Sequence, residues 1–92
     1  MERNENEKMR NEIINLIDEN SSNWIKAAFF SDEVIEVIME ALYSKWEQNN
    51  EQGMPIDYAT GDELKIMLKK ARQYASMKPE EAMRLVLKRM EE

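Results

Sequence analysis

The sequence predicts an all-α protein, a compact bundle of four to five helices that forms one domain over residues 1–92. Three observations support this fold class. The chain holds only two Gly and two Pro, so few positions force a helix to end. Apolar residues make up 42% of the sequence and charged residues 35%, a balance typical of a folded helical domain. The apolar residues recur every three to four positions, which places them on one face of a helix.

The first two helices are predicted from their apolar spacing and from the polar break between them. The first covers about residues 5–19, after a terminus of about residues 1–6 that we expect to be flexible. Its buried stripe follows the spacing i, i+4, i+7 and i+8 and consists of Met9, Ile13, Leu16 and Ile17. The polar residues 20–23 compete for backbone hydrogen bonds and end this helix. A short helix over residues 23–30 follows.

The third helix is predicted to run from Ser31, its expected N-cap, to about Asn49. Acidic residues at positions 32 and 33 suit the positive end of the helix dipole. At 100° per residue, the apolar side chains cover about 200° of the circumference. These side chains are Val34, Ile35, Val37, Ile38, Met39, Ala41, Leu42 and Trp46. An arc of this width indicates several neighbours, so we expect this helix to lie at the centre of the bundle.

Residues 49–59 form the predicted linker. Gly53 and Pro55 prevent a helix from continuing through it. After them in the sequence, side chains alternate with the two-residue period of a short strand. In this stretch Ile56, Tyr58 and Thr60 alternate with Asp57 and Ala59. The prediction therefore includes one short extended segment near residues 56–59 as an option.

The last two helices carry the clearest local signals. Thr60 and Glu63 have the spacing of a capping box, which marks the start of the fourth helix. The apolar face of that helix is made of Leu64, Met67, Leu68, Ala71, Tyr74 and Ala75. Pro79 suits the first position of the fifth helix. The apolar arc of the fifth helix is broad and is interrupted only by Arg89.

The sequence lacks the residues on which many reaction centres depend. It contains no His and no Cys, which removes the usual base at neutral pH and thiolate chemistry. We therefore predict a non-enzymatic protein with no cofactor and no metal site. The net charge of −6 disfavours attraction to nucleic acid and to anionic membranes. No signal peptide is visible and no apolar stretch is long enough for a bilayer, so a cytoplasmic location is expected.

An acidic ridge is predicted on the third helix. It consists of Glu33, Glu36, Glu40 and Glu47, and no Lys or Arg follows any of them at the fourth position. The acidic ridge is a docking face for a basic partner, a crude mimic of a row of phosphates, or a solvated helix face. Phe30 follows Phe29 directly, so the two rings cannot share one buried face. Phe30 is therefore a candidate contact with a partner or with a second copy in a homodimer.

A basic stripe offers an alternative site. It contains Lys65, Lys69 and Arg72 on the fourth helix, together with Lys88 on the fifth. These residues are interpreted either as phosphate contacts to nucleic acid or as charges that support solubility and match the helix dipoles.

Residues 54–92 resemble the ribbon–helix–helix family of transcription factors and antitoxins in their layout. The resemblance rests on a strand at residues 56–60, a helix that opens at Gly61, and a second helix with apolar residues Ala82, Met83, Leu87 and Met90. It implies a dimer that pairs its strands and reads DNA through outward-pointing strand residues. Here these positions hold Pro55, Asp57 and Ala59, and the family's usual Gly between the helices is absent.

The sequence therefore favours a small cytoplasmic regulator or adaptor that acts by binding another protein. One concrete form is an inhibitor of a nucleic-acid-handling complex, encoded by a phage or another mobile element, an origin that the Asn, Lys, Ile and Glu bias suggests. The alternative is a DNA-binding transcriptional regulator or antitoxin that uses the helices within residues 60–92.

Overall fold

A computed structural model describes residues 2–19 and 22–91 of the chain. All regular secondary structure in these residues is helical, which confirms the all-α class. The α-helices are α1 (Glu2–Ile14), α2 (Asn23–Phe30), α3 (Glu33–Gln48), α4 (Gly61–Ala75) and α5 (Pro79–Glu91). A π-helical segment, η1 (Asn15–Glu19), continues α1, and a 3₁₀ turn, η2 (Pro55–Tyr58), precedes α4.

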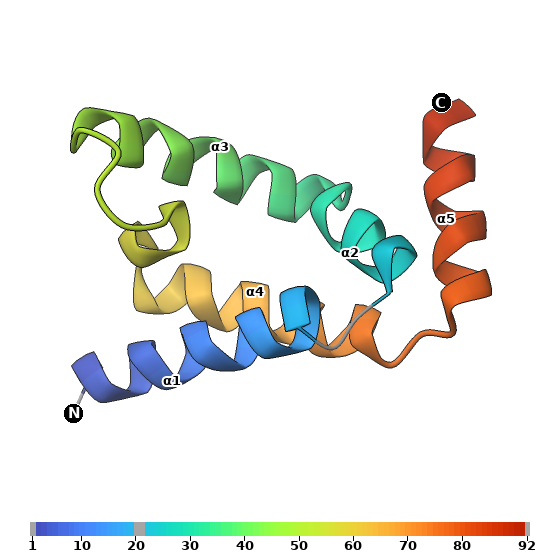
Figure 1. The fold of residues 1–92 in the computed structure, drawn as a ribbon, viewed down its shortest axis with the longest axis horizontal. Helices are drawn as coiled ribbons and strands as arrows, with labels where there is room; N and C mark the ends of the chain where they lie inside the picture. The colour runs from blue at the N-terminus through green and yellow to red at the C-terminus, as the bar shows by residue number, and fades with distance from the viewer. Residues whose placement is uncertain (1, 20–21, 92) are drawn as a thin grey trace.

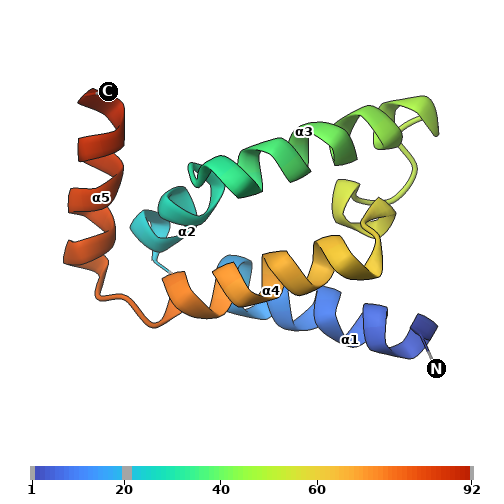
Figure 2. The same cartoon turned by 180° about the vertical axis from the view of Figure 1, so that it is seen from behind.

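The helices form two layers and an end piece (Figures 1 and 2). In one layer α1 and α4 lie side by side and run in the same direction. In the other layer α2 leads into α3, and α3 runs opposite to α1 and α4. Across the end of both layers stands α5, whose main packing partner is α2. Much of α5 therefore has no neighbour among the described residues.

The central helix is α4, not α3. It contacts α1, η1 and α2, and it buries five residues against the three that α3 buries. The expectation that the third helix lies at the centre is therefore wrong. The main neighbour of α3 is η2, and this short turn covers only part of the apolar arc of α3. As a result, Val34 and Val37 remain 43% and 69% exposed.

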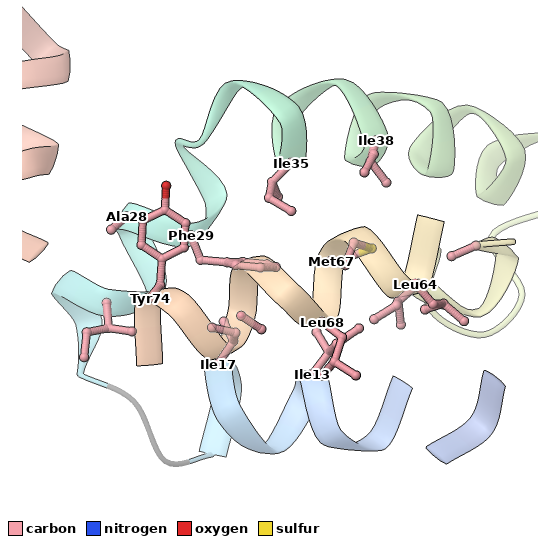
Figure 3. Close-up of a cluster of buried hydrophobic side chains, with 14 of the residues drawn as sticks. Ile13, Ile17, Ala28, Phe29, Ile35, Ile38, Leu64, Met67, Leu68 and Tyr74 are labelled. Carbon is pink, nitrogen blue, oxygen red and sulfur yellow. The ribbon is translucent and has the colours of Figure 1, made fainter. Parts of the chain in front are cut away.

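The hydrophobic core lies between the two layers (Figure 3). Each layer contributes side chains that are almost fully buried, and they are Ile13, Ile17, Phe29, Ile35, Leu64 and Met67. The apolar face predicted for the fourth helix is confirmed, because α4 buries Leu64, Met67, Leu68, Ala71 and Tyr74. This face anchors Tyr74 next to α2, where it reaches the polar groups described below.

Local capping signals set most of the helix boundaries. The predicted bounds of α2 are confirmed, and the Ser22 side chain caps its first turn by accepting from the amide of Ile25. The capping box is also confirmed, because Thr60 and Glu63 each accept the other's amide hydrogen. The predicted N-cap of the third helix is wrong. Ser31 is the C-cap of α2, and the next residue, Asp32, caps α3.

The first helix differs from its prediction in two ways. It begins at Glu2 rather than near residue 5, so α1 includes part of the segment expected to be flexible. It also changes to a π-helix at Asn15. No Gly or Pro lies in this stretch to signal the change.

The segment near residues 56–59 forms the 3₁₀ turn η2, so the optional strand is wrong. The amide of Ala59 donates to the carbonyl of Ile56 at 3.1 Å, and the carboxylate of Asp57 accepts from the amide of Met54 at 2.9 Å. These local bonds replace the strand ladder that a ribbon–helix–helix dimer needs. Ile56 is buried beneath α3, so the linker is a packed connection between the layers.

Candidate protein-docking surface

A groove of about 670 Å³ lies between the first turn of α3 and the C-terminal half of α5. Its floor is polar and its walls are apolar, while two acidic residues stand at its rim. We call it the α3–α5 groove, with Asp32, Lys70 and Arg89 in the floor, Val34, Val86 and Met90 in the walls, and Glu33 and Glu36 at the rim.

The groove exists because, among the described residues, α5 packs extensively against only one helix, α2. Ala82 and Val86 of α5 are buried, which fits its packing against α2. One helix cannot cover the broad apolar arc of α5, so Leu87 and Met90 remain 45% and 76% exposed. The exposed part of this arc borders the groove at Met90.

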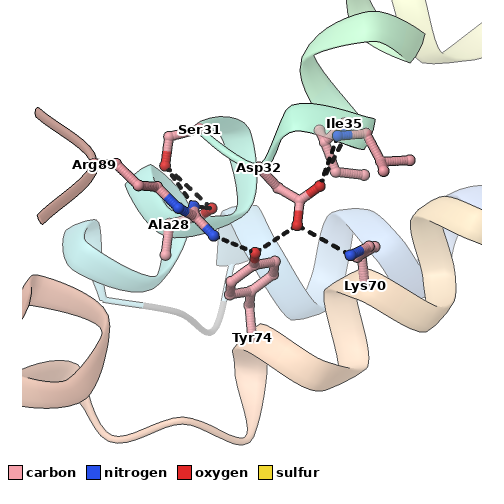
Figure 4. A network of polar contacts seen from close by, with 8 residues as sticks. Ala28, Ser31, Asp32, Ile35, Lys70, Tyr74 and Arg89 are labelled. Atoms are coloured by element: carbon pink, nitrogen blue, oxygen red, sulfur yellow. Dashed lines mark hydrogen bonds and ion pairs between the residues drawn. The ribbon is translucent and has the colours of Figure 1, made fainter. Parts of the chain in front are cut away.

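The carboxylate of Asp32 organises the floor (Figure 4). Its Oδ1 accepts the amide hydrogens of Val34 and Ile35 at 2.9 and 3.3 Å, which caps α3. Its Oδ2 accepts from the hydroxyl of Tyr74 at 2.6 Å and lies 3.1 Å from Nζ of Lys70. Asp32 is only 6% exposed, and these four donors compensate for the loss of its hydration.

Arg89 joins α5 to the same network. One of its terminal nitrogens donates to the carbonyl of Ala28 at 2.7 Å and to the hydroxyl of Ser31 at 2.8 Å. The other donates to the Tyr74 hydroxyl at 2.7 Å, and the guanidinium lies 5.6 Å from the centre of the Tyr74 ring. Arg89 thereby adds a charged donor to the carbonyl of Ala28 in the last turn of α2, which also accepts from the Ser31 hydroxyl at 3.3 Å.

The protonation states follow from these contacts. Burial alone would raise the pKa of Asp32, but the bonds from Tyr74, Lys70 and two amides outweigh it and hold that pKa below its ordinary value. Burial and the carboxylate of Asp32 raise the pKa of Tyr74, although Arg89 opposes this shift. At neutral pH the floor therefore contains a charged carboxylate and a neutral phenol.

The acidic groups at the rim are not neutralised. Lys70 is bound to Asp32, and Arg89 is held by Ala28 and Ser31 as well as by Tyr74. Glu33 and Glu36 are exposed and form no ion pair with any described residue. The three partners of Arg89 are uncharged, so it keeps its positive charge. With three acidic and two basic side chains in its lining, the groove therefore carries one net negative charge.

The structure leaves all four residues of the acidic ridge exposed on one helix, as expected from the helical spacing. Glu33 and Glu36 line the groove, whereas Glu40 and Glu47 lie further along α3. At 1.5 Å per residue, Glu47 is about 16 Å beyond Glu36 along the helix axis. Only half of the ridge therefore belongs to the groove.

Phe30 is 41% exposed, but it does not line the groove. Its ring stands edge to face against that of Phe29, with 5.0 Å between the ring centres. It borders a different hollow together with Tyr43 and Met54. The candidate partner residues thus fall into two separate surfaces.

The basic stripe does not form one patch. Arg72 donates to the carboxylate of Glu12 on α1 at 2.7 Å, which ties α4 to α1 and lowers the pKa of Glu12. Lys65 and Lys69 are exposed on α4, whereas Lys88 lies on α5, across the end of the layers. No strand accompanies these residues within the described ranges.

Sequence reasoning missed the floor of the groove. The helical spacing predicts Tyr74 as part of an apolar face and Asp32 as an acid of the first turn. One signal was present, because Arg89 interrupts an otherwise apolar arc. A cation in that position needs buried acceptors, and a buried Tyr hydroxyl needs a partner.

Comparison with protein families, with curated proteins and with solved structures yields no match. Within residues 2–19 and 22–91, no helix has the length and apolar character required to cross a membrane. The same residues contain no group of three or more acidic side chains placed to hold a metal ion.

Proposed function

We propose that this chain is a small non-enzymatic regulator or adaptor in the cytoplasm that binds a basic, amphipathic segment of another protein. The α3–α5 groove is the docking surface. The observation that carries the proposal is the combination, in one groove, of exposed apolar walls with an unneutralised acidic rim.

The apolar walls supply the affinity in this proposal. Val34 is 43% and Met90 76% exposed, so an apolar side chain placed between them removes water from both. Burial of apolar surface contributes about 25 cal/mol per Å². Met90 also has three rotatable side-chain bonds, which lets it adapt to partners of different shape.

The acidic rim sets the sign of the partner's charge. Glu33 and Glu36 lie beside the walls, and Glu40 extends the negative surface along α3. A partner helix with Lys or Arg next to its apolar stripe matches this arrangement. Such charge pairs mainly increase the association rate and the specificity. Lys and Arg are the residues with which nucleic-acid-handling proteins contact phosphate, so their basic surfaces are suitable partners.

The floor supports a binding role over a catalytic one. Asp32 is the only buried charged residue among those described, and its carboxylate accepts from four donors. A carboxylate that is held in this way has its pKa lowered, which makes it a poor proton acceptor at neutral pH.

The test uses a designed peptide helix with Leu on one face and Lys on the other, and measures its binding to the full chain by fluorescence anisotropy. A peptide of identical composition in scrambled order is the control ligand. We expect the amphipathic peptide alone to bind, with an affinity that falls as salt increases.

Protein variants locate the site. We expect Met90→Lys and the pair Glu33→Lys with Glu36→Lys each to weaken binding about tenfold or more, which corresponds to about 1.4 kcal/mol. The matched control is Glu47→Lys with Glu51→Lys, which changes the net charge equally but lies outside the groove. Equal loss in both pairs, or equal binding of the scrambled peptide, contradicts docking in the groove.

A further inference from the structure

A second hollow, which we call the apolar cavity, opens on the other side of α3. Its volume is about 200 Å³, and it is lined by residues of α1, η1, the end of α2, α3, η2 and α4. Tyr43 lines the apolar cavity and Val34 lines the groove. Because these residues are nine positions apart, they point in nearly opposite directions from α3. The two sites are therefore separate, and the inference below does not rest on the proposed function.

The apolar cavity has a buried apolar floor and an open mouth. Ile17, Phe29 and Met67 line it and are each only 1% exposed. Phe30, Tyr43 and Met54 also line it, but each is more than 40% exposed. A ligand that enters from solvent thus meets aromatic rings first and buried aliphatic groups behind them.

The lining restricts the chemistry of the occupant. Asp18 is its only charged residue, and no described buried side-chain nitrogen or oxygen lacks a partner. No buried side chain in the described part of the chain is therefore left free to bond a polar ligand in the inner part of the cavity. The rings of Phe29 and Phe30 favour edge-to-face contact with another aromatic ring, and Met39, Met54 and Met67 add sulfur contacts to such a ring.

The size of the apolar cavity restricts the occupant further. An apolar cavity of about 150 Å³ is known to take up benzene. A hollow of about 200 Å³ therefore suits a ring system somewhat larger than benzene, such as the two fused rings of indole. Oδ1 of Asp18 lies 3.9 Å from Nζ of Lys26, but the Asp18 side chain is 45% exposed, so its carboxylate remains accessible to an N–H group at the edge of such a ligand.

We propose that the apolar cavity binds a compact aromatic molecule of about the size of indole, with a ring N–H directed to Asp18. One wall is the π-helix η1, which contributes both Ile17 and Asp18. Short π-helical segments within helices are found frequently at functional sites. The place of η1 beside the cavity agrees with this tendency.

The test titrates indole into the full chain and follows the methyl signals of Ile and Met by NMR. For nine non-hydrogen atoms in a largely apolar site, we expect a dissociation constant on the order of 0.1–1 mM. Signals of residues that line the apolar cavity should shift and saturate. 1-Methylindole, which lacks the N–H donor, should bind several-fold more weakly, and Asp18→Ala should remove that difference.

Two variants fill the apolar cavity, namely Met39→Phe and Ile14→Phe, and both positions are half-buried in the present structure. We expect each to abolish the saturable shifts while the circular-dichroism spectrum stays helical. Val37→Phe is the matched control, because Val37 lies on the same helix as Met39 and is 69% exposed outside the cavity. It should bind indole as the original chain does.

Several outcomes overturn the proposal. The first is an absence of saturable shifts, and the second is indole binding that persists when both filling variants fold. A shift at Met90 instead of the cavity residues would place the ligand in the groove. Shifts that follow protein concentration rather than indole would assign the cavity to a side chain of a second copy.

Discussion

The hydroxyl of Tyr74 donates to Oδ2 of Asp32 over 2.6 Å, although the two residues are 42 positions apart in the sequence. The same hydroxyl accepts a hydrogen from Arg89 at 2.7 Å. One phenol therefore connects the N-cap of α3 to α4 and α5. In an environment of low polarity such a chain of hydrogen bonds stabilises strongly when complete and costs free energy when one member is missing.

Tyr74→Phe should lower the free energy of unfolding by about 1–3 kcal/mol. The variant keeps the ring but removes the donor to Asp32 and the acceptor of Arg89, so both are left with an unmet hydrogen bond. Urea denaturation measures the loss. Tyr43→Phe is the control, since Tyr43 is 48% exposed and its hydroxyl bonds to no described residue. If both variants lose equal stability, the network does not contribute as the geometry indicates.

The lowered pKa of Asp32 predicts an acid-dependent loss of stability. Below the pKa of an unfolded Asp, about 3.9, Asp32 becomes protonated in the unfolded chain while it is still ionised in the folded protein. Stability should therefore fall as the pH drops below about 4 and toward the lowered pKa. Asp32→Asn removes this titration, so the difference in unfolding free energy between the two proteins should be largest at pH 7 and shrink at pH 3.

The measurement is urea denaturation of both proteins at several pH values. The other carboxyl groups titrate in both chains, so the difference between them isolates Asp32. A difference that stays constant from pH 7 to pH 3 would show that the charge of Asp32 does not stabilise the fold.

Elements with a local cause could be predicted from the sequence. The start of α4 follows from the reciprocal bonds between Thr60 and Glu63, which lie only three residues apart. The start of α2 depends in the same way on the nearby Ser22. In both places the hydrogen-bonding partners can be recognised from the chain alone.

Features that depend on residues far apart in the sequence could not be predicted. The wide apolar arc of α3 shows how much apolar surface it has, but not which neighbour covers it, and η2 covers less than the arc. The floor of the groove depends on the meeting of Asp32 with Tyr74 and Arg89, which come from three different helices. No spacing rule connects them, so the sequence predicts only the outer part of the candidate docking surface, at Glu33 and Glu36.

Gly53→Ala should destabilise the protein by about 1–2 kcal/mol. Gly53 has a φ of +71°, a left-handed conformation that costs most other residues about this amount. An added Cβ would also lie 2.7 Å from Oδ2 of Asp57, the oxygen that accepts from the amide of Met54. Thermal or urea denaturation measures the effect on the free energy of unfolding.

Gly61→Ala is the matched control for this substitution. Gly61 lies in the first turn of α4, and an added Cβ there would meet the side chain of Asn6, whose oxygen is the nearest atom at 3.2 Å. Because Ala favours the helix, the change should be close to neutral or slightly stabilising. A larger loss at Gly61 than at Gly53 would contradict the assignment of strain to the linker.

Arg89→Lys should loosen α5 without unfolding the rest of the protein. A Lys keeps the charge, but its single nitrogen cannot serve Ala28, Ser31 and Tyr74 in the fork that a guanidinium provides. Because the main packing partner of α5 is α2, this helix can open on its own. We expect amide hydrogen exchange to become about tenfold faster in α5 while α1 and α4 stay protected.

Arg84→Lys is the control for this experiment, because Arg84 is exposed on the same helix and forms no ion pair with the described part of the chain. It should leave exchange in α5 unchanged. Faster exchange spread evenly over α1, α4 and α5 would mean that Arg89 stabilises the whole fold and not the attachment of one helix. Selective exchange in α5 would instead establish that the α3–α5 groove has one movable wall, whose position the floor network controls.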